Sequence, residues 1–264
     1  MRVPGRFLLL SLALAAPFVA APIQAFSEDG GERSIQPAAE QLFALANQTR
    51  AQAAAGRLQW DPALAAAALK HCRRMAAEGP IAHRYGGEAD VAGRAGQAGA
   101  HFDLIEENVA VGPSAAVIHD QWMRSPGHRS NLLSLEVDRV GVAVVESRGE
   151  LYAVADYARE VQSLGAAQVE ARVSAMIKVR ELAVVGDPSP ARRACAANEG
   201  IPHSQGGVLP GFVMRWQGAD LTRLPGALVE RLDSGRYQRA AVGCCPAQGL
   251  EGSFTAYRLA VLLY

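Results

Sequence analysis

The sequence predicts an α+β protein built in two parts. Three features lead to this class: amphipathic helical stretches in the first half, two strand-like runs joined by a tight turn, and a change of texture near residue 161. After that change, helical and strand-like segments alternate again. The chain has 264 residues, of which 50% are hydrophobic and 20% charged, so it suits one large or two small folded domains.

Residues 1–25 have the plan of a secretory signal peptide. Arg2 and Arg6 precede an apolar run, and small residues follow it. The run is shorter than the roughly 20 residues that a spanning helix needs, although an uncleaved membrane anchor is the alternative. Ile23 and Ala25 suit the positions before a cleavage site, which predicts cleavage after Ala25. We therefore expect a secreted, periplasmic or cell-envelope protein without a membrane span in its mature form.

A polar, glycine-containing leader over residues 26–37 is expected to be flexible. The first helix is predicted from about Ala38 to Ala54, where apolar residues recur at helical spacing, and Gly56 ends it.

The second helix has clear start and stop signals. Asp61 is a natural N-cap, Pro62 fits the first helical position, and Gly79 follows the last turn. His71 lies on the apolar stripe of this helix, so we expect a packed, hydrogen-bonded histidine rather than a ligand. Cys72 flanks the same stripe and is expected to be a buried thiol.

The next segments complete the first part. Residues 88–100 can form a small-residue helix, and their glycines follow no strand, which argues against a dinucleotide fingerprint. A further helix begins near Ser114. Two strands, 139–146 and 150–158, are joined by a turn in which Gly149 suits a tight hairpin.

Residues 165–264 are predicted to form a small α+β module. A long helical stretch over 164–185 leads into the breaker-rich segment 186–195. An apolar run, a helix near 224–235 and two strands ending at 245 and 264 follow. The scattered aromatic residues of this part are more easily explained as core than as a ligand-facing surface; they are Trp216, Tyr237 and Tyr257.

Export permits a disulfide in the C-terminal part. Cys195 can pair with Cys244 or Cys245, and the sequence leaves the choice open. Either bridge closes a loop of about 50 residues, worth on the order of 4 kcal/mol in the chain-entropy description.

The charge balance excludes several partners. The chain has 26 basic and 26 acidic residues and only 6% aromatic residues. It therefore lacks the electrostatic footprint of a nucleic-acid-binding or anionic-membrane-binding protein.

The stretch "SPGHRSN" draws attention to His128. Ser125 can cap the following helix, Pro126 fits its first position, and His128 then lies at the third. The positive end of a helix disfavours imidazolium, so His128 is expected to be neutral near pH 7. Its candidate partners are His83 and one of the adjacent Glu106 and Glu107, since strand alternation turns only one of them inward. Two histidines and a carboxylate suit zinc, although their spacing matches no local zinc motif.

At this point the sequence resembles a known family. The segments that carry the resemblance run in order from "FALANQTRAQ" through "HRY", "EENVA" and "WMRSPGHRSNLL" to "VGVAVV" and "ADYA". They are similar to a bacterial CAP/SCP domain, the superfamily of cysteine-rich secretory and pathogenesis-related proteins. The resemblance covers about residues 37–159 and implies an α-β-α sandwich with a short antiparallel sheet, which we place at residues 38–160.

The resemblance also implies a cleft lined by His83, His128 and Glu107. In several family members such histidines bind zinc or another divalent ion. The supporting residues implied by the motifs are Asn47, Arg50, Arg129 and Asn131.

Two departures from the family pattern lower the expected metal affinity. Glu106 replaces a glycine that the family commonly has before the cleft glutamate. Ser125 stands where larger members carry a second glutamate. The cleft then offers three ligands, and water would complete the coordination of an ion.

These features support three functions. The favoured one is an exported, non-catalytic binding protein whose cleft holds a metal ion, a lipid or a peptide of the cell envelope. A metal-assisted hydrolase of cell-wall glycan or peptide, with Glu107 acting on bound water, is the alternative. The third is an envelope structural protein that binds through residues 165–264. The absence of G-x-S-x-G and H-E-x-x-H motifs argues against the commonest hydrolase routes.

Overall fold

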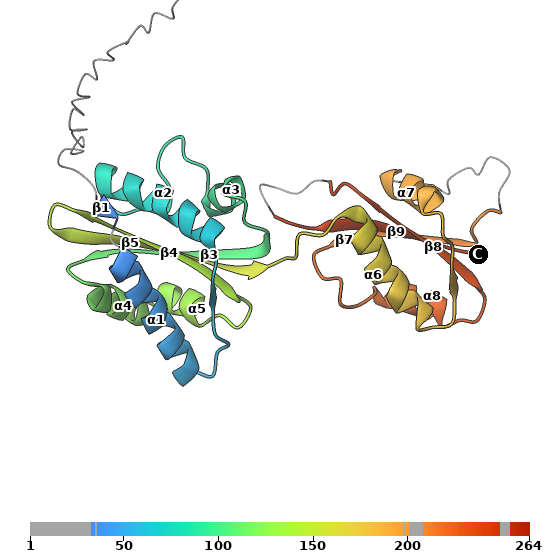
Figure 1. The fold of residues 1–264 in the computed structure, drawn as a ribbon, viewed down its shortest axis with the longest axis horizontal. Coiled ribbons are helices and arrows are strands. Elements are labelled where there is room, and N and C mark those ends of the chain that lie inside the picture. Colours follow the sequence, from blue (N-terminus) through green and yellow to red (C-terminus); the bar gives the residue numbers. More distant parts are fainter. Residues whose placement is uncertain (1–32, 35, 198, 201–207, 249–253) are drawn as a thin grey trace, which may run out of the picture. The chain divides into compact units, whose positions relative to one another are not determined.

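The computed structural model describes residues 33–34, 36–197, 199–200, 208–248 and 254–264. The predicted signal peptide, with its cleavage position at Ala25, lies outside these residues. The α+β class is confirmed: helices pack on two separate sheets, each formed by its own part of the chain (Figure 1). No helix in the described ranges has the length and apolar character to cross a membrane.

The first sheet has five strands in the order β1-β4-β5-β3, with β2 parallel to β4. The long strands are antiparallel neighbours, and the full set is β1 (Arg33–Ser34), β2 (Gln59–Trp60), β3 (Phe102–Gly112), β4 (Arg139–Ser147) and β5 (Glu150–Glu160). Strand β1 falls in the leader that was expected to be flexible, and it pairs with Val145 and Glu146 of β4.

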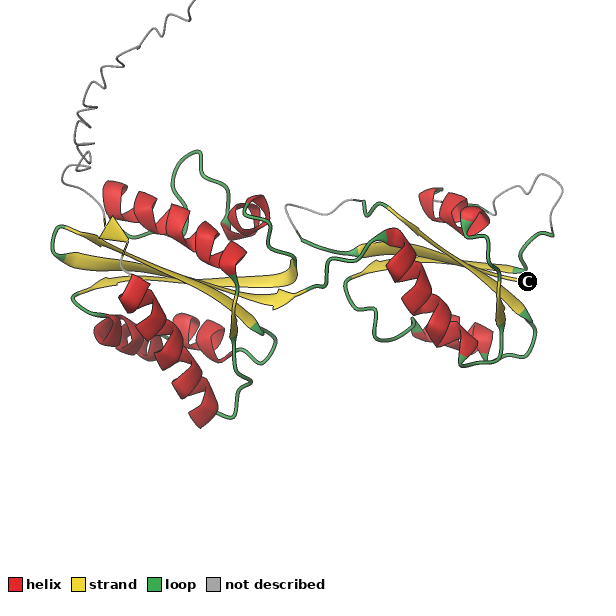
Figure 2. Ribbon diagram, viewed as in Figure 1, coloured by secondary structure: helices red, strands yellow, loops and turns green. Residues whose placement is uncertain are grey.

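Helices cover both faces of this sheet (Figure 2). One face carries α2 (Pro62–Glu78) and α3 (Val91–Gln97), and the other carries α1 (Gln36–Gln52), α4 (Ala115–Arg124) and α5 (Pro126–Leu133). Strand alternation explains the two cores, because Val142 and Val144 pack toward α1 and α4 whereas Ala143 and Val145 pack toward α2. The α-β-α sandwich expected from the resemblance is confirmed.

The predicted start and end of α2 are confirmed. The Asp61 side chain accepts hydrogen bonds from the backbone N–H groups of Ala63 and Leu64, and Gly79 follows the last turn with a positive φ. Cys72 is buried, and its thiol donates to the carbonyl oxygen of Tyr152 at 3.1 Å. The helix lies so close to β4 that a Cβ added to Gly141 would stand 2.0 Å from the nitrogen of Ala65, so only glycine fits there.

The second sheet belongs to the C-terminal part and has the order β6-β8-β9-β7. Its strands are β6 (Ala183–Val184), β7 (Phe212–Gly218), β8 (Arg239–Cys245) and β9 (Tyr257–Leu263), and its helices are α6 (Ala166–Lys178), α7 (Ser189–Ala196) and α8 (Gly226–Leu232). Helices α6 and α8 cover one face and α7 covers the other (Figure 1). The three aromatic residues considered above pack at or against the core on the α6 face.

The predicted extent of one helix in this part was wrong, and a second helix was not predicted. The helical stretch predicted over 164–185 ends at Lys178, because Glu181 takes a positive φ and Ala183–Val184 then pairs with β8. The breaker-rich segment contains α7, in which Pro190 occupies the first turn, where proline is tolerated. Proline there starts a helix instead of preventing one.

The disulfide joins Cys195 to Cys245. Consecutive strand residues point to opposite faces, so Cys245 faces α7, which carries Cys195, whereas Cys244 faces α6. The buried Glu170 of α6 accepts a hydrogen bond from the backbone N–H of Cys244 at 2.9 Å and two more from Arg192 of α7. The face of the strand decides the pairing that the sequence left open.

Candidate functional site

The three residues that the resemblance implies for a cleft, His83, Glu107 and His128, lie near one another on or beside β3, an edge strand of the first sheet. Side chains from α4 and α5 donate hydrogen bonds to backbone carbonyl oxygens of β3. Asn131 donates to the carbonyl oxygen of Glu107 at 3.1 Å, and Trp122 donates to that of Val109 at 3.3 Å. Asn108 in turn donates to the carbonyl oxygen of His128 at 2.9 Å. Asn131 therefore has the supporting role expected of it, whereas Arg129 is exposed.

Glu107 turns inward and lies behind His83. Its carboxylate is 4% exposed and its Oε1 lies 2.8 Å from Nδ1 of His83, whose side chain is 59% exposed. A carboxylate only accepts hydrogen bonds, so Nδ1 of His83 carries the proton. Neutral His83 then presents the lone pair of Nε2. The hydrogen bond to Glu107 is the main reason that the pKa of His83 is raised above its ordinary value.

His128 lies close to His83. The two ring centroids are 6.3 Å apart, with an angle of 50° between the ring planes. Pro126 occupies the first position of α5 and His128 the third, as predicted, and Ser125 is the N-cap residue, but its side chain makes no capping hydrogen bond. Burial, and secondarily the charge of His83, lowers the pKa of His128. The direction agrees with the expectation of a neutral imidazole.

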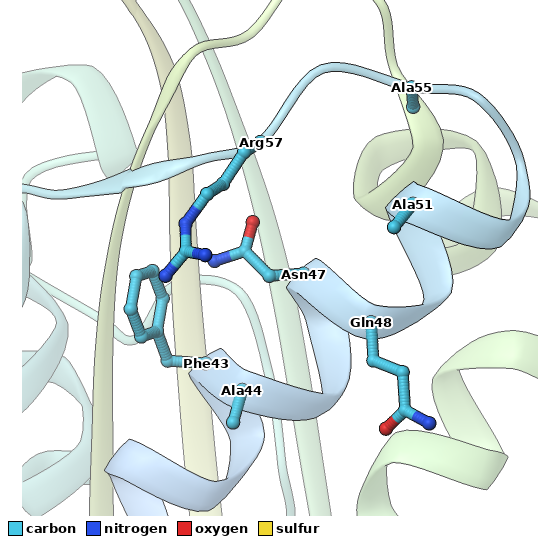
Figure 3. Close-up of a pocket in the computed structure, with 7 residues that line it drawn as sticks. All are labelled: Phe43, Ala44, Asn47, Gln48, Ala51, Ala55 and Arg57. Carbon is cyan, nitrogen blue, oxygen red and sulfur yellow. The ribbon is translucent and has the colours of Figure 1, made fainter.

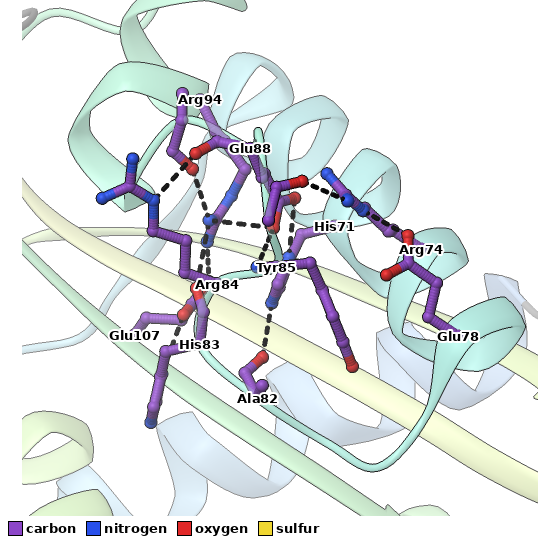
Figure 4. Close-up of polar contacts among 12 residues, drawn as sticks. His71, Arg74, Glu78, Ala82, His83, Arg84, Tyr85, Glu88, Arg94 and Glu107 are labelled. Carbon is purple, nitrogen blue, oxygen red and sulfur yellow. Dashed lines mark hydrogen bonds and ion pairs between the residues drawn. The ribbon is translucent and has the colours of Figure 1, made fainter.

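The buried Arg94 connects the His83–Glu107 pair to another histidine, His71 (Figure 4). Arg94 of α3 forms an ion pair with Oε2 of Glu107 and lies 3.9 Å from Glu88. Glu88 lies 2.9 Å from Nδ1 of His71, whose Nε2 lies 2.8 Å from the carbonyl oxygen of Ala82. His71 is thus packed and hydrogen-bonded, as its position on the apolar stripe predicted.

A second acid lies beside Glu107. Asp156 is opposite Glu107 in the β3–β5 register, has no exposed surface, and neither of its carboxyl oxygens meets a donor among the described residues. Burial, followed by the charge of Glu107, raises its pKa well above the ordinary value. A protonated Asp156 can donate to Glu107, which leaves one negative charge to balance Arg94.

Asn47 and Arg50, which were expected as supporting residues, stabilise the domain away from His83 and Glu107. Asn47 exchanges two hydrogen bonds with the backbone of Leu58, at 3.2 and 2.8 Å. Arg50 is 1% exposed and donates to backbone carbonyl oxygens in the loop after α1, in the last turn of α5 and in the segment that follows α5; these belong to Gly56, Leu132, Ser134 and Val137.

Glu106 and Glu107 point in opposite directions, as alternation predicted. Glu106 is half-buried on the face of Asn108 and Tyr157, and burial, with a smaller effect of Glu136, raises its pKa. It forms no part of the His83–Glu107 pair.

The chemistry of the cleft suits a metal ion only in part. The described residues contain no group of three or more His, Cys, Asp or Glu side chains arranged to hold one. His83 and His128 each have a ring nitrogen to offer, whereas both oxygens of Glu107 are already engaged by His83 and Arg94. The three-ligand set stays a prediction.

A separate groove runs over the outer face of α1 (Figure 3). Its volume is about 480 Å³, and it is lined by Phe43, Ala44, Asn47, Gln48, Ala51, Ala55 and Arg57. Asn47, expected as a supporting residue, lines it, whereas His83, Glu107 and His128 do not.

Comparison with known families identifies the domain that carries the cleft. The family model described as CAP, the cysteine-rich secretory protein family, matches residues 43–157. These residues form a CAP domain. No curated protein matches the chain.

Solved structures similar to the CAP domain come from several bacteria. An outer surface protein of Borrelia burgdorferi is 19% identical over 50% of this chain and 99% of its own, with a TM-score of 0.46. An extracellular SCP-domain protein of Bacillus anthracis is 25% identical over 47% of this chain, with a TM-score of 0.43. A cysteine-rich secretory protein of Staphylococcus aureus is 19% identical over 47%, with a TM-score of 0.40. The chain spans 41% and 39% of the last two proteins.

Sequence reasoning missed Arg94 and Asp156. Arg94 stands among small residues in "AGRAGQ", and a single charge in an otherwise apolar helix is a signal that could have found it. Asp156, within "YAVADYA", is likewise a lone acid in an apolar strand.

Proposed function

We propose that this chain is an exported, non-catalytic binding protein whose CAP domain holds a divalent metal ion through His83 and His128. The proposal is supported chiefly by the proximity of the two imidazoles, whose ring centroids are 6.3 Å apart. The signal-peptide pattern and the Cys195–Cys245 disulfide support export.

The separation of the rings is compatible with one shared ion. Zinc–nitrogen bonds are about 2.0–2.1 Å long, so two rings on one ion have centroids at most about 6.5 Å apart. His83 and His128 lie within this limit but near its upper end. A modest side-chain rotation is therefore needed for a tetrahedral arrangement, which supports a weak site completed by water or by a bound ligand.

Glu107 orients the metal-binding nitrogen of His83. A carboxylate that accepts the second N–H of a ligating histidine fixes its tautomer and raises its basicity. Direct coordination by Glu107, the role expected from the resemblance, would require the carboxylate to turn away from Arg94.

The same contacts weigh against the hydrolase alternative. A general base must have a lone pair directed at the water that it deprotonates. Both oxygens of Glu107 face protein donors, and its carboxylate is 4% exposed. The metal would then serve binding rather than turnover.

Zinc titration by calorimetry tests the proposal on the mature protein. We expect one weak site, lost in both His83→Ala and His128→Ala, and unchanged in His101→Ala, which removes an exposed histidine of the same domain. Wild-type affinity in either of the first two variants would reject a shared site. Release of products from peptidoglycan that disappears in Glu107→Ala would instead support the hydrolase.

A further inference from the structure

Arg94 is a buried charged group in contact with both His83 and Glu107, and neither the family motifs nor the metal chemistry gives it a role. Its side chain is 1% exposed. It extends from α3, a helix of seven residues made otherwise of small or uncharged side chains. A buried guanidinium is costly unless every interaction around it is well placed, so its contacts indicate what it does.

The guanidinium holds His83 at two points. Its NH1 group donates to the backbone carbonyl oxygen of His83 at 3.2 Å and to that of Ala89 at 3.1 Å. Its NH2 group bonds to Oε2 of Glu107, whose Oε1 accepts the Nδ1 proton of His83. The backbone of His83 and the acceptor of its ring are thus fixed by one planar group.

We propose that Arg94 is a positioning residue that fixes the orientation and the tautomer of His83 in the metal-binding cleft. The expected effect on metal affinity rests on the proposed function. The orientation and tautomer of His83 do not, because they can be measured in the metal-free protein.

The shape of arginine explains why this residue suits the position. Its fork presents several N–H donors in one plane and can bind a carboxylate and carbonyl oxygens together. Lysine carries the same charge on a single nitrogen, so it can neutralise Glu107 but cannot keep all of these contacts in the same geometry.

The loss of Arg94 would act on an exposed side chain. The ring of His83 is held mainly by its hydrogen bond to Glu107, because 59% of its side chain is exposed. Without the planar fork of Arg94, Oε2 of Glu107 would lose the donor that holds it, and the carboxylate could turn so that Oε1 no longer meets Nδ1 of His83. His83 would then rotate and exchange between its two tautomers.

The experiment compares Arg94→Lys with Arg84→Lys in the metal-free protein. Arg84 lies one residue from His83, is exposed, and donates to the carbonyl oxygen of Glu88, so it is a matched control in the same network. The measurement is the ¹⁵N chemical shift of the two ring nitrogens of His83 above its pKa. We expect a dominant Nδ1–H tautomer in the wild type and in Arg84→Lys, and a mixture in Arg94→Lys. Zinc affinity of Arg94→Lys should fall about 10-fold, the lower end for loss of an outer-shell partner.

Two results would overturn the inference. One is a folded Arg94→Lys protein in which the His83 nitrogens keep their wild-type shifts. If that variant does not fold, Arg94→Gln removes the charge and the planar fork while keeping an N–H donor and Glu107, and retention of the Nδ1–H tautomer there would refute the role. A wild-type protein that binds no zinc would refute the proposed function but leave the tautomer test intact.

Discussion

Replacing Cys245 by alanine should destabilise the C-terminal part far more than replacing its neighbour Cys244. The disulfide joins residues separated by 50 positions, for which the chain-entropy relation gives about 4 kcal/mol at 25 °C. Cys244 is half-buried, points to the other face of β8 and takes no part in the bridge, so Cys244→Ala should cost less than about 1 kcal/mol.

Hydrogen exchange of the β8 and β9 amides is the suitable assay. It reports the opening free energy of this sheet separately from that of the CAP domain. A thiol titration of the denatured, non-reduced wild type should detect two of the four cysteines. Equal destabilisation by the two substitutions, or a larger effect of Cys244→Ala, would refute the argument from strand faces.

Three further predictions concern the CAP domain. Gly141→Ala should destabilise it by about 3 kcal/mol or more, the upper end for overpacking, because the added methyl would meet the backbone of Ala65; an unchanged urea midpoint would contradict this close approach. Arg50→Ala should cost more than about 3 kcal/mol, since several carbonyl oxygens lose their donor at about 1–3 kcal/mol each, and thermal unfolding would show it. Zinc affinity should fall as the pH drops. The pKa of His83 is raised, so its protonation competes with metal already above pH 6.5, whereas His128, whose pKa is lowered, stays neutral further down; a flat calorimetric profile between pH 8 and pH 6 would contradict this order.

The sequence predicted those elements whose ends are set by local chemistry. Asp61, Pro62 and Gly79 delimit α2 through capping contacts that depend only on neighbouring residues. The turn at Arg148 and Gly149 is similar, because both residues take a positive φ there, as a two-residue hairpin loop requires.

Long-range contacts decide the features that the sequence could not predict. The strand β6 exists because Ala183–Val184 pairs with β8, more than fifty residues further along the chain. The choice of Cys245 over Cys244 depends on which face of β8 meets α7.

In the candidate site, too, the motifs predicted the individual residues but not their long-range contacts. His83, Glu107 and His128 could be named from their motifs, and in the structure His83 contacts Glu107 and lies close to His128. The engagement of Glu107 by Arg94 could not be predicted, because it depends on how α3 packs beside β3.

The most direct test of a shared metal site is a zinc titration followed by the ¹⁵N signals of the histidine rings. We expect the Nε2 signal of His83 and one ring nitrogen of His128 to shift together, with a midpoint at the same zinc concentration, while the signals of His71 remain unchanged. Shifts of only one of the two cleft histidines, or midpoints at different zinc concentrations, would contradict the proposal that both hold one ion.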